Sequence, residues 1–140
     1  MLDLPEEMTI KEHFFNFVNA KGEPTKFWFS VSDLSTGAWA DYQDVVSTAY
    51  TVQLSDDGSR EYVYPPGLVE LTRFSLLVKK WNLLLADGAP APLTEGIWRQ
   101  IPRVWTAQID RAIIVVAPEI NGLPARDRSI PTDGEIPNPL

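Results

Sequence analysis

The stretch Trp81–Ile113, WNLLLADGAPAPLTEGIWRQIPRVWTAQIDRAI, is expected to decide how the second half of this 140-residue chain folds. Asp87-Gly88 is typical of a turn that ends a helix, because glycine adopts the left-handed C-cap conformation at little cost. Pro90-Ala91-Pro92 follows, and prolines interrupt a helix because they lack the backbone N–H. The stretch therefore predicts a compact helical corner, and nothing in it performs chemistry.

Helices on both sides of this corner are predicted from apolar periodicity and capping residues. Downstream, Thr94 is expected to cap a short helix through Gln100, and Pro102 to open a last helix that Pro118 closes. Upstream, a helix over residues 68–85 is predicted to bury a wide apolar stripe. This stripe consists of Leu68, Leu71, Phe74, Leu77, Val78, Trp81, Leu84 and Leu85.

Two β-hairpins are predicted in the first half of the chain. Residues 12–31 are predicted to form a hairpin, in which one face of the first strand carries His13, Phe15 and Phe17 and the other carries Phe14, Asn16 and Val18. Aromatic and β-branched side chains on both sides of a turn suit such a half-buried pair of strands. Residues 50–64 form a second alternating pair around Asp57-Gly58, a strong signal for a tight hairpin turn. Between the hairpins, Asp33 and Ser35 are each able to cap a helix.

Together these elements predict an α+β fold, in which two β-hairpins form a small antiparallel sheet packed on two to three helices. Residues 1–120 are expected to form a single domain, because a chain of this length with 44% hydrophobic residues supplies one core. Residues 121–140 contain repeated prolines and show no apolar period. We expect them to form an extended C-terminal tail.

The charge and composition exclude several classes of partner. The chain has 19 acidic and 12 basic residues, a net charge of −7, so nucleic acid is not an expected partner because its phosphates would be repelled. No apolar run approaches the ~20 residues that span a bilayer, and the N-terminus does not resemble a secretory signal, so no membrane partner is expected. The chain has no cysteine, which excludes disulfide and thiolate chemistry.

Few side chains are suited to catalysis or metal binding, and we expect no enzymatic activity, no cofactor and no metal site. The lone histidine, His13, has no second histidine and no cysteine with which to complete a zinc site of the usual type. No Gly-x-Ser-x-Gly turn presents a nucleophile for it. Two acidic pairs remain, Asp41 with Asp44 and Asp56 with Asp57. A solvated helix face and ordinary turn chemistry explain them.

The five tryptophans are expected to lie mostly in the core, but an exposed tryptophan marks a protein-binding surface. Trp98 is predicted to be the most exposed of them, because its short helix is isolated between prolines. Trp98 and Trp105 are therefore candidate partner-binding residues.

The segment from Trp81 to Ile113 resembles the tail assembly chaperones of long-tailed bacteriophages. In those proteins a tryptophan at the end of a helix precedes an acidic-Gly turn, a Pro-Leu-Thr-Glu-like helix start and an Ile/Leu-Pro step. The matching residues are Trp81-Asn82-Leu83, Asp87-Gly88, Pro92-Leu93-Thr94-Glu95 and Ile101-Pro102.

This resemblance implies a non-enzymatic phage morphogenesis protein that binds the tape measure protein during tail assembly. It implies a location in the host cytoplasm and partners among other phage tail or virion proteins. The sequence also leaves a homo-oligomer open.

An alternative function is that of a structural virion protein, such as a neck, connector or minor tail subunit, located in the virion. The tail at residues 121–140 motivates this hypothesis, because proline-spaced arms often become ordered on a neighbouring subunit. Ile130 and Ile136 would then be the anchoring, partner-binding residues of the arm.

Overall fold

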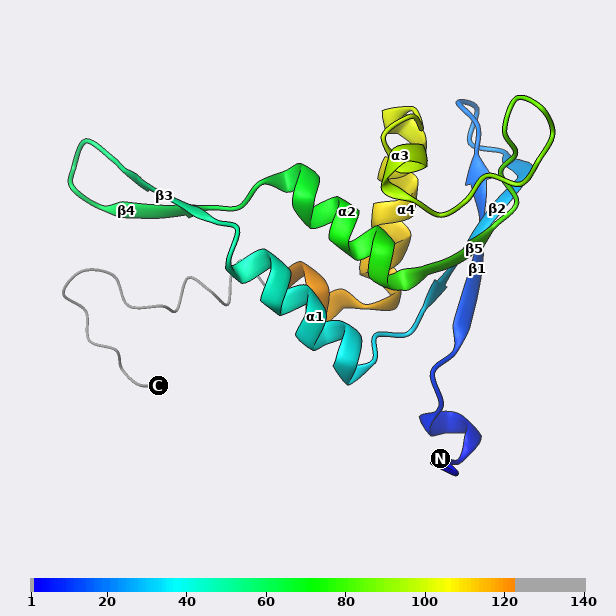
Figure 1. Cartoon of the computed structure of the whole chain (residues 1–140), viewed down its shortest axis with the longest axis horizontal. Helices are drawn as coiled ribbons and strands as arrows, with labels where there is room; N and C mark the ends of the chain where they lie inside the picture. The colour runs from blue at the N-terminus through cyan, green and yellow to red at the C-terminus, as the bar shows by residue number, and fades with distance from the viewer. Residues whose placement is uncertain (1, 123–140) are drawn as a thin grey trace.

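The computed structural model describes residues 2–122, leaving aside the side chain of Tyr62. In chain order the elements are η1 Glu6–Met8, β1 Glu12–Val18, β2 Pro24–Ser32, α1 Thr36–Ser47, β3 Thr51–Leu54, β4 Arg60–Val63, α2 Pro66–Leu77, β5 Val78–Trp81, α3 Glu95–Trp98, α4 Arg103–Val116 and η2 Pro118–Gly122. The predicted α+β class is confirmed: a three-stranded antiparallel sheet packs on helices, and a two-stranded ribbon stands apart (Figure 1).

The first predicted hairpin forms and supplies two strands of the sheet. β1 and β2 pair antiparallel, with Phe15 directly opposite Phe29. Phe17, Phe29 and Val31 are at most 2% exposed, because they lie on the face of the sheet that packs on the helices. The hydrophobic side chains from which these strands were predicted therefore supply part of the core.

The long helix predicted over residues 68–85 is wrong in its second half. α2 ends at Leu77, and the chain continues as β5, which pairs antiparallel with β2. A β-bulge places one extra residue on β5, so that Val78 is buried while Lys79 and Lys80 both face solvent. The pairing satisfies main-chain groups on the edge of β2 that a continued helix would leave unpaired.

The second predicted hairpin also forms, but it does not join the sheet as predicted. β3 and β4 pair only with each other, because β5 occupies the second edge of β2. All four residues of β3 are exposed, and the ribbon extends away from the rest of the domain (Figure 1). The single predicted sheet is thus replaced by a sheet and a projecting arm.

Helices α1, α2 and α4 form the second layer of the domain. Ser35 caps α1 by accepting a hydrogen bond from the N–H of Ala38 at 3.1 Å. Asp33, the other predicted cap, instead accepts a bond from the N–H of Lys11. The largest fully buried side chains of this layer are Tyr42 and Val46 of α1, Phe74 and Leu77 of α2, and Ile109 and Ile113 of α4.

One buried ion pair ties the three helices together. Arg73 of α2 is 6% exposed and donates from Nη1 to Asp110 of α4, with its nearer carboxylate oxygen at 3.0 Å. Its Nε donates to the hydroxyl of Tyr42 on α1 at 3.1 Å. Burial raises the pKa of Tyr42, although the bond from Arg73 opposes this effect. Because the donors and acceptors of the cluster are paired with one another, we interpret it as structural.

We expect Arg73→Met to destabilise the domain, because it leaves the carboxylate of Asp110 poorly solvated and without its cation. The free energy of unfolding in urea should fall by roughly 3–5 kcal/mol, the usual loss for breaking a buried ion pair. The double variant Arg73→Met/Asp110→Leu removes both charges and should recover most of this loss. A double variant as unstable as the single one would show that packing around Arg73, not charge, holds the helices.

Candidate functional site

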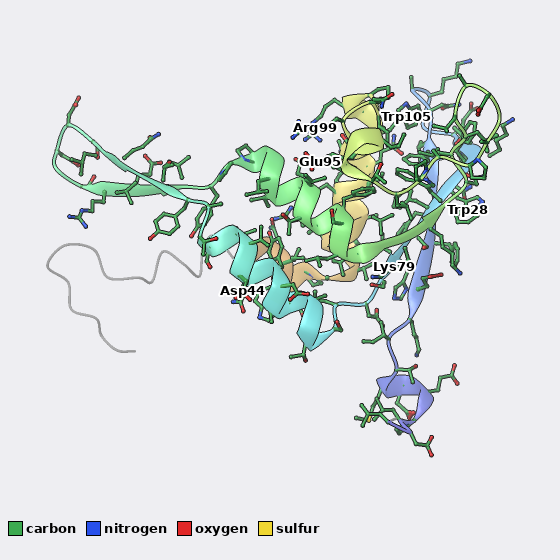
Figure 2. The ribbon with its side chains drawn as sticks, in the orientation of Figure 1. Trp28, Asp44, Lys79, Glu95, Arg99 and Trp105 are labelled. Carbon is green, nitrogen blue, oxygen red and sulfur yellow. The ribbon has the colours of Figure 1, made fainter. Side chains whose placement is uncertain are left out.

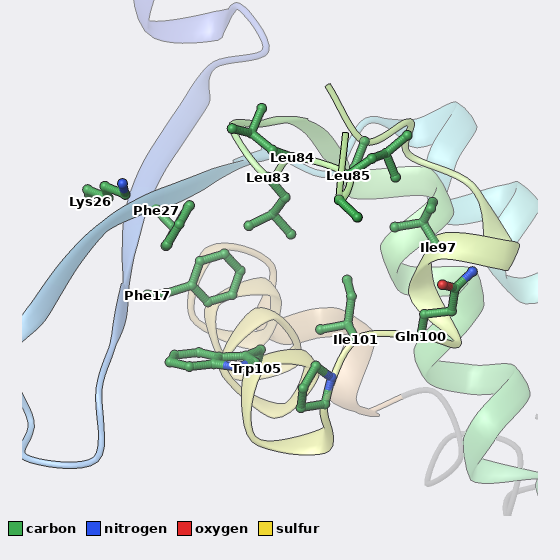
Figure 3. Close-up of a pocket in the computed structure, with 13 residues that line it drawn as sticks. Phe17, Lys26, Phe27, Leu83, Leu84, Leu85, Ile97, Gln100, Ile101 and Trp105 are labelled. Atoms are coloured by element: carbon green, nitrogen blue, oxygen red, sulfur yellow. The ribbon is translucent and has the colours of Figure 1, made fainter. Parts of the chain in front are cut away.

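An open apolar groove of about 500 Å³ lies between the end of the sheet and the start of α4. Its walls come from four parts of the chain, and Phe17, Leu83, Ile101 and Trp105 point toward one another around the space (Figure 3). The lining residues are Phe17, Lys26, Phe27, Leu83, Leu84, Leu85, Ala86, Ala91, Ile97, Gln100, Ile101, Pro102 and Trp105.

The wall formed by residues 83–91 is held against the sheet by Asn82. The side-chain oxygen of Asn82 accepts from the N–H of Trp28 at 2.8 Å, and its amide nitrogen donates to the carbonyl of Lys26 at 3.0 Å. The Asn82 side chain thus continues the β2–β5 ladder where strand β5 has ended. This places the leucines that follow it beside the aromatic residues of the sheet.

The same wall is closed on itself by a tight turn. Leu85 donates its N–H to the carbonyl of Ala89 at 2.7 Å, and Gly88 donates to Leu85 at 2.9 Å. Gly88 has a φ of +88°, as its predicted left-handed conformation requires, but it serves this turn and not the C-cap of a helix. The end of this wall is held by Trp81, whose Nε1–H donates to the carbonyl of Ala91 at 2.7 Å.

The opposite wall is formed by Trp105, which lies in the first turns of α4 (Figure 2). Its ring packs edge to face against the ring of Phe17, with the two ring centroids 5.5 Å apart. Gln108, one turn further along α4, accepts from the N–H of Val18 at 2.8 Å and donates to its carbonyl at 2.9 Å. The two bonds fix α4 to the end of β1, so the groove has preformed walls.

The sequence-predicted binding residues fall in different places. Trp105 lines the groove and is half-buried. Trp98, predicted to be the most exposed tryptophan, is only 9% exposed, because its ring stacks on Phe74 at 4.4 Å where α3 crosses α2. This prediction is therefore wrong. Ile130 and Ile136 lie outside the described residues.

The groove has a largely apolar lining with an exposed rim. Leu84 is 60% exposed and Leu85 38%, so both side chains present apolar surface to solvent at the rim. Lys26 is the one charged side chain among the lining residues, and its Nζ lies 5.4 Å from the ring centre of Phe27. Such a surface is suited to binding an apolar segment of another molecule.

The titratable residues considered in the sequence do not line the groove, and two of them, His13 and Asp57, have hydrogen-bond partners elsewhere. His13 Nε2 is 2.7 Å from Asp33 Oδ1, a contact that joins the start of β1 to the end of β2. Asp57 accepts from the N–H of Ser59, and this bond, first among several, lowers the pKa of its carboxyl group. Asp44 is exposed on α1, far from Trp105 (Figure 2). Within residues 2–122 no group of acidic or histidine side chains is arranged to hold a metal ion.

Sequence reasoning missed the leucine wall of the groove. Leu84 and Leu85 belong to the predicted helix stripe, in which they would be core residues, and Leu83 falls within the same predicted helix. The signal that could have found them is the apolar run followed by Asp87-Gly88 and Pro90, a pattern that also fits a folded loop.

No protein-family model matches this chain, and no curated protein or solved structure matches it either. In residues 2–122 no helix is both long and apolar enough to cross a membrane. The groove is therefore interpreted from its own residues.

The contact between His13 and Asp33, which joins the start of β1 to the end of β2, can be tested by changing Asp33. Bonds from His13 and then from the N–H of Lys11 hold the pKa of Asp33 below its usual value of 3.8. A carboxylate with a depressed pKa stabilises the folded state above that value, and this contribution is lost as the pH falls through the folded pKa. Asp33→Asn should therefore lower the urea midpoint at pH 7, and the difference from the unmodified protein should shrink steadily below about pH 4. An unchanged difference at pH 2.5–3 would show that the charge of Asp33 is irrelevant.

Proposed function

We propose that this chain is a non-enzymatic phage morphogenesis protein that acts as a tail assembly chaperone and binds the tape measure protein in the host cytoplasm. The observation that carries the proposal is the preformed apolar groove beside Trp105, with its exposed leucine rim. Grooves of this kind accept the apolar face of an amphipathic helix, with anchors at successive turns.

Two features of the groove support a helical occupant. Its volume of about 500 Å³ is in the range of clefts that take up several side chains, and its openness to solvent leaves room for a longer segment. Its walls are fixed by the side chains of Asn82 and Gln108, so little conformational entropy is lost on binding. Lys26 at the edge would favour an acidic residue next to the apolar face of the bound helix.

The sequence resemblance also supports the proposal, with one change. Thr94-Glu95 starts helix α3 and Ile101-Pro102 precedes helix α4, as in the chaperone pattern. Trp81 lies in strand β5 and not at the end of a helix, so that element of the resemblance does not hold.

The test is co-expression with the tape measure protein of the same phage, followed by affinity purification. We expect the unmodified chain to keep the tape measure protein soluble and to co-purify with it. The variant Leu84→Glu/Leu85→Glu should abolish the complex, because it places two carboxylates on the groove rim without entering the core.

Val115→Glu is the matched control, since Val115 is a 73% exposed aliphatic residue of α4 that does not line the groove. It should bind like the unmodified chain. The proposal fails if the unmodified chain forms no complex, or if the rim variant and the control bind equally well.

A second candidate function is that of a structural virion subunit, and the projecting β3–β4 ribbon favours it. Isolated two-stranded ribbons are marginally stable in water and commonly gain stability by packing on another molecule. Mass spectrometry of purified particles separates the two functions. Stoichiometric copies in the particle indicate a virion subunit, whereas absence from the particle agrees with a chaperone that leaves after assembly.

A further inference from the structure

The β3–β4 ribbon has two free edges, and they differ in character. β3 reads Thr51-Val52-Gln53-Leu54 and carries no charge, no proline and no bulge, whereas β4 begins with Arg60-Glu61. Val52 is 48% exposed and Leu54 73%. An uncharged and exposed edge strand without a bulge is a template for pairing with another strand.

The other strand edges each carry a charge or a capping side chain. At the end of β1, Gln108 occupies both the N–H and the carbonyl of Val18. β5 carries Lys79 and Lys80 as exposed residues on its edge. Charges and capping side chains of this kind block edge-to-edge association. Among the strands of residues 2–122, β3 lacks such protection.

The pattern of hydrogen bonds between β3 and β4 shows which main-chain groups of β3 point outward, away from β4. Ser55 donates its N–H to the carbonyl of Ser59 at 2.9 Å, so this pair is a hydrogen-bonded pair of the ladder. Hydrogen-bonded and non-hydrogen-bonded pairs alternate in an antiparallel ladder, and Gln53 opposite Glu61 is therefore also a hydrogen-bonded pair. The main-chain groups of Val52 and Leu54 consequently point away from β4.

We propose that β3 pairs antiparallel with β3 of a second copy of this chain, about a twofold axis at Gln53. In this register Val52 of one copy lies opposite Leu54 of the other, and each such pair exchanges both of its outward main-chain hydrogen bonds. Because of the twofold symmetry, the outward N–H and C=O groups of Val52 and Leu54 are all hydrogen-bonded in both copies. Val52 and Leu54 share one face of the ribbon, so the resulting four-stranded sheet has a continuous apolar strip.

Charge favours a second copy in this register. Residues 1–66 contain 11 acidic and 4 basic side chains, so most contacts between two copies through this half of the chain would oppose like charges. The β3 edge avoids this, because it carries no charge. The acidic turns at Asp56 and Asp57 of the two copies would be separated by about six residues of strand, roughly 20 Å, well beyond the screening length at physiological salt.

The C-terminal segment of the same chain is a poorer occupant of this edge. Residues 123–140 include Pro124, Pro131, Pro137 and Pro139, and each proline lacks the N–H that a ladder requires. The pairing of β3 with β3 is also independent of the groove, which lies at the other end of the domain and is lined by other residues.

The absence of cysteine from the chain allows a direct test by disulfide trapping. Gln53→Cys introduces a single thiol at the twofold axis, where a non-hydrogen-bonded pair brings the two Cα atoms to about 4.5 Å, within disulfide reach. Glu61→Cys is the matched control, because Glu61 is the exposed cross-strand partner of Gln53 on the other edge. Under mild oxidation, Gln53→Cys should form a covalent dimer at least about tenfold faster than Glu61→Cys, since pairing raises the local thiol concentration.

A second pair of variants tests the edge itself. Val52→Pro removes an outward N–H of β3 and should abolish the fast trapping of Gln53→Cys while leaving the β3–β4 ladder intact. Tyr62→Pro, at the position directly opposite Val52 on β4, should leave the trapping unchanged. Equal trapping rates for the two cysteine variants would overturn the proposal, as would fast trapping that survives Val52→Pro. Fast trapping of both cysteine variants would point instead to nonspecific association of the ribbon.

Discussion

Phe29 faces Trp81 and Val31 faces Val78 in the short ladder between β2 and β5, and the arrangement of the second half of the chain depends on this pairing. It requires α2 to end at Leu77, because the residues that follow must be extended to pair. It also brings Asn82 next to Trp28, where the asparagine side chain prolongs the ladder. The loop at residues 83–91 is therefore placed beside Phe17 and Phe27 of the sheet, and the groove forms between them.

The helical layer complements this constraint with a different kind of contact. The apolar core alone would allow α1, α2 and α4 to slide over one another, since apolar contacts have little directionality. The bonds from Arg73 to Tyr42 and to Asp110 specify one relative position of the three helices. Gln108 then ties α4 to β1, so that sheet and helices form a single support for the groove. A binding surface supported in this way loses little entropy when it is filled.

The domain therefore presents two surfaces of opposite character. The groove beside Trp105 has an apolar lining and walls fixed by Asn82 and Gln108, whereas the β3–β4 ribbon projects from the domain and exposes main-chain groups. Near the base of the ribbon the rings of Tyr50 and Tyr64 pack together, with their centroids 5.8 Å apart, and Tyr64 packs against the core. In our interpretation the groove recognises a partner of different sequence and the ribbon recognises a second copy. The two surfaces belong to different parts of the chain and can be altered separately.

The first hairpin, the Asp57-Gly58 turn, the Thr94 cap and the break at Pro102 were determined by the sequence itself, because each depends on residues close together in the chain. The position of Trp105 near the start of α4 follows from Pro102 in the same way. Only the tertiary structure decided the end of α2, the strand Val78–Trp81, the separate ribbon and the burial of Trp98. The segment Val78–Trp81 after Leu77 is compatible with a helix and with a strand, and the free edge of β2, more than forty residues earlier, selects the strand. Trp98 is buried because Phe74 of another helix lies beneath it, a contact that no local pattern encodes.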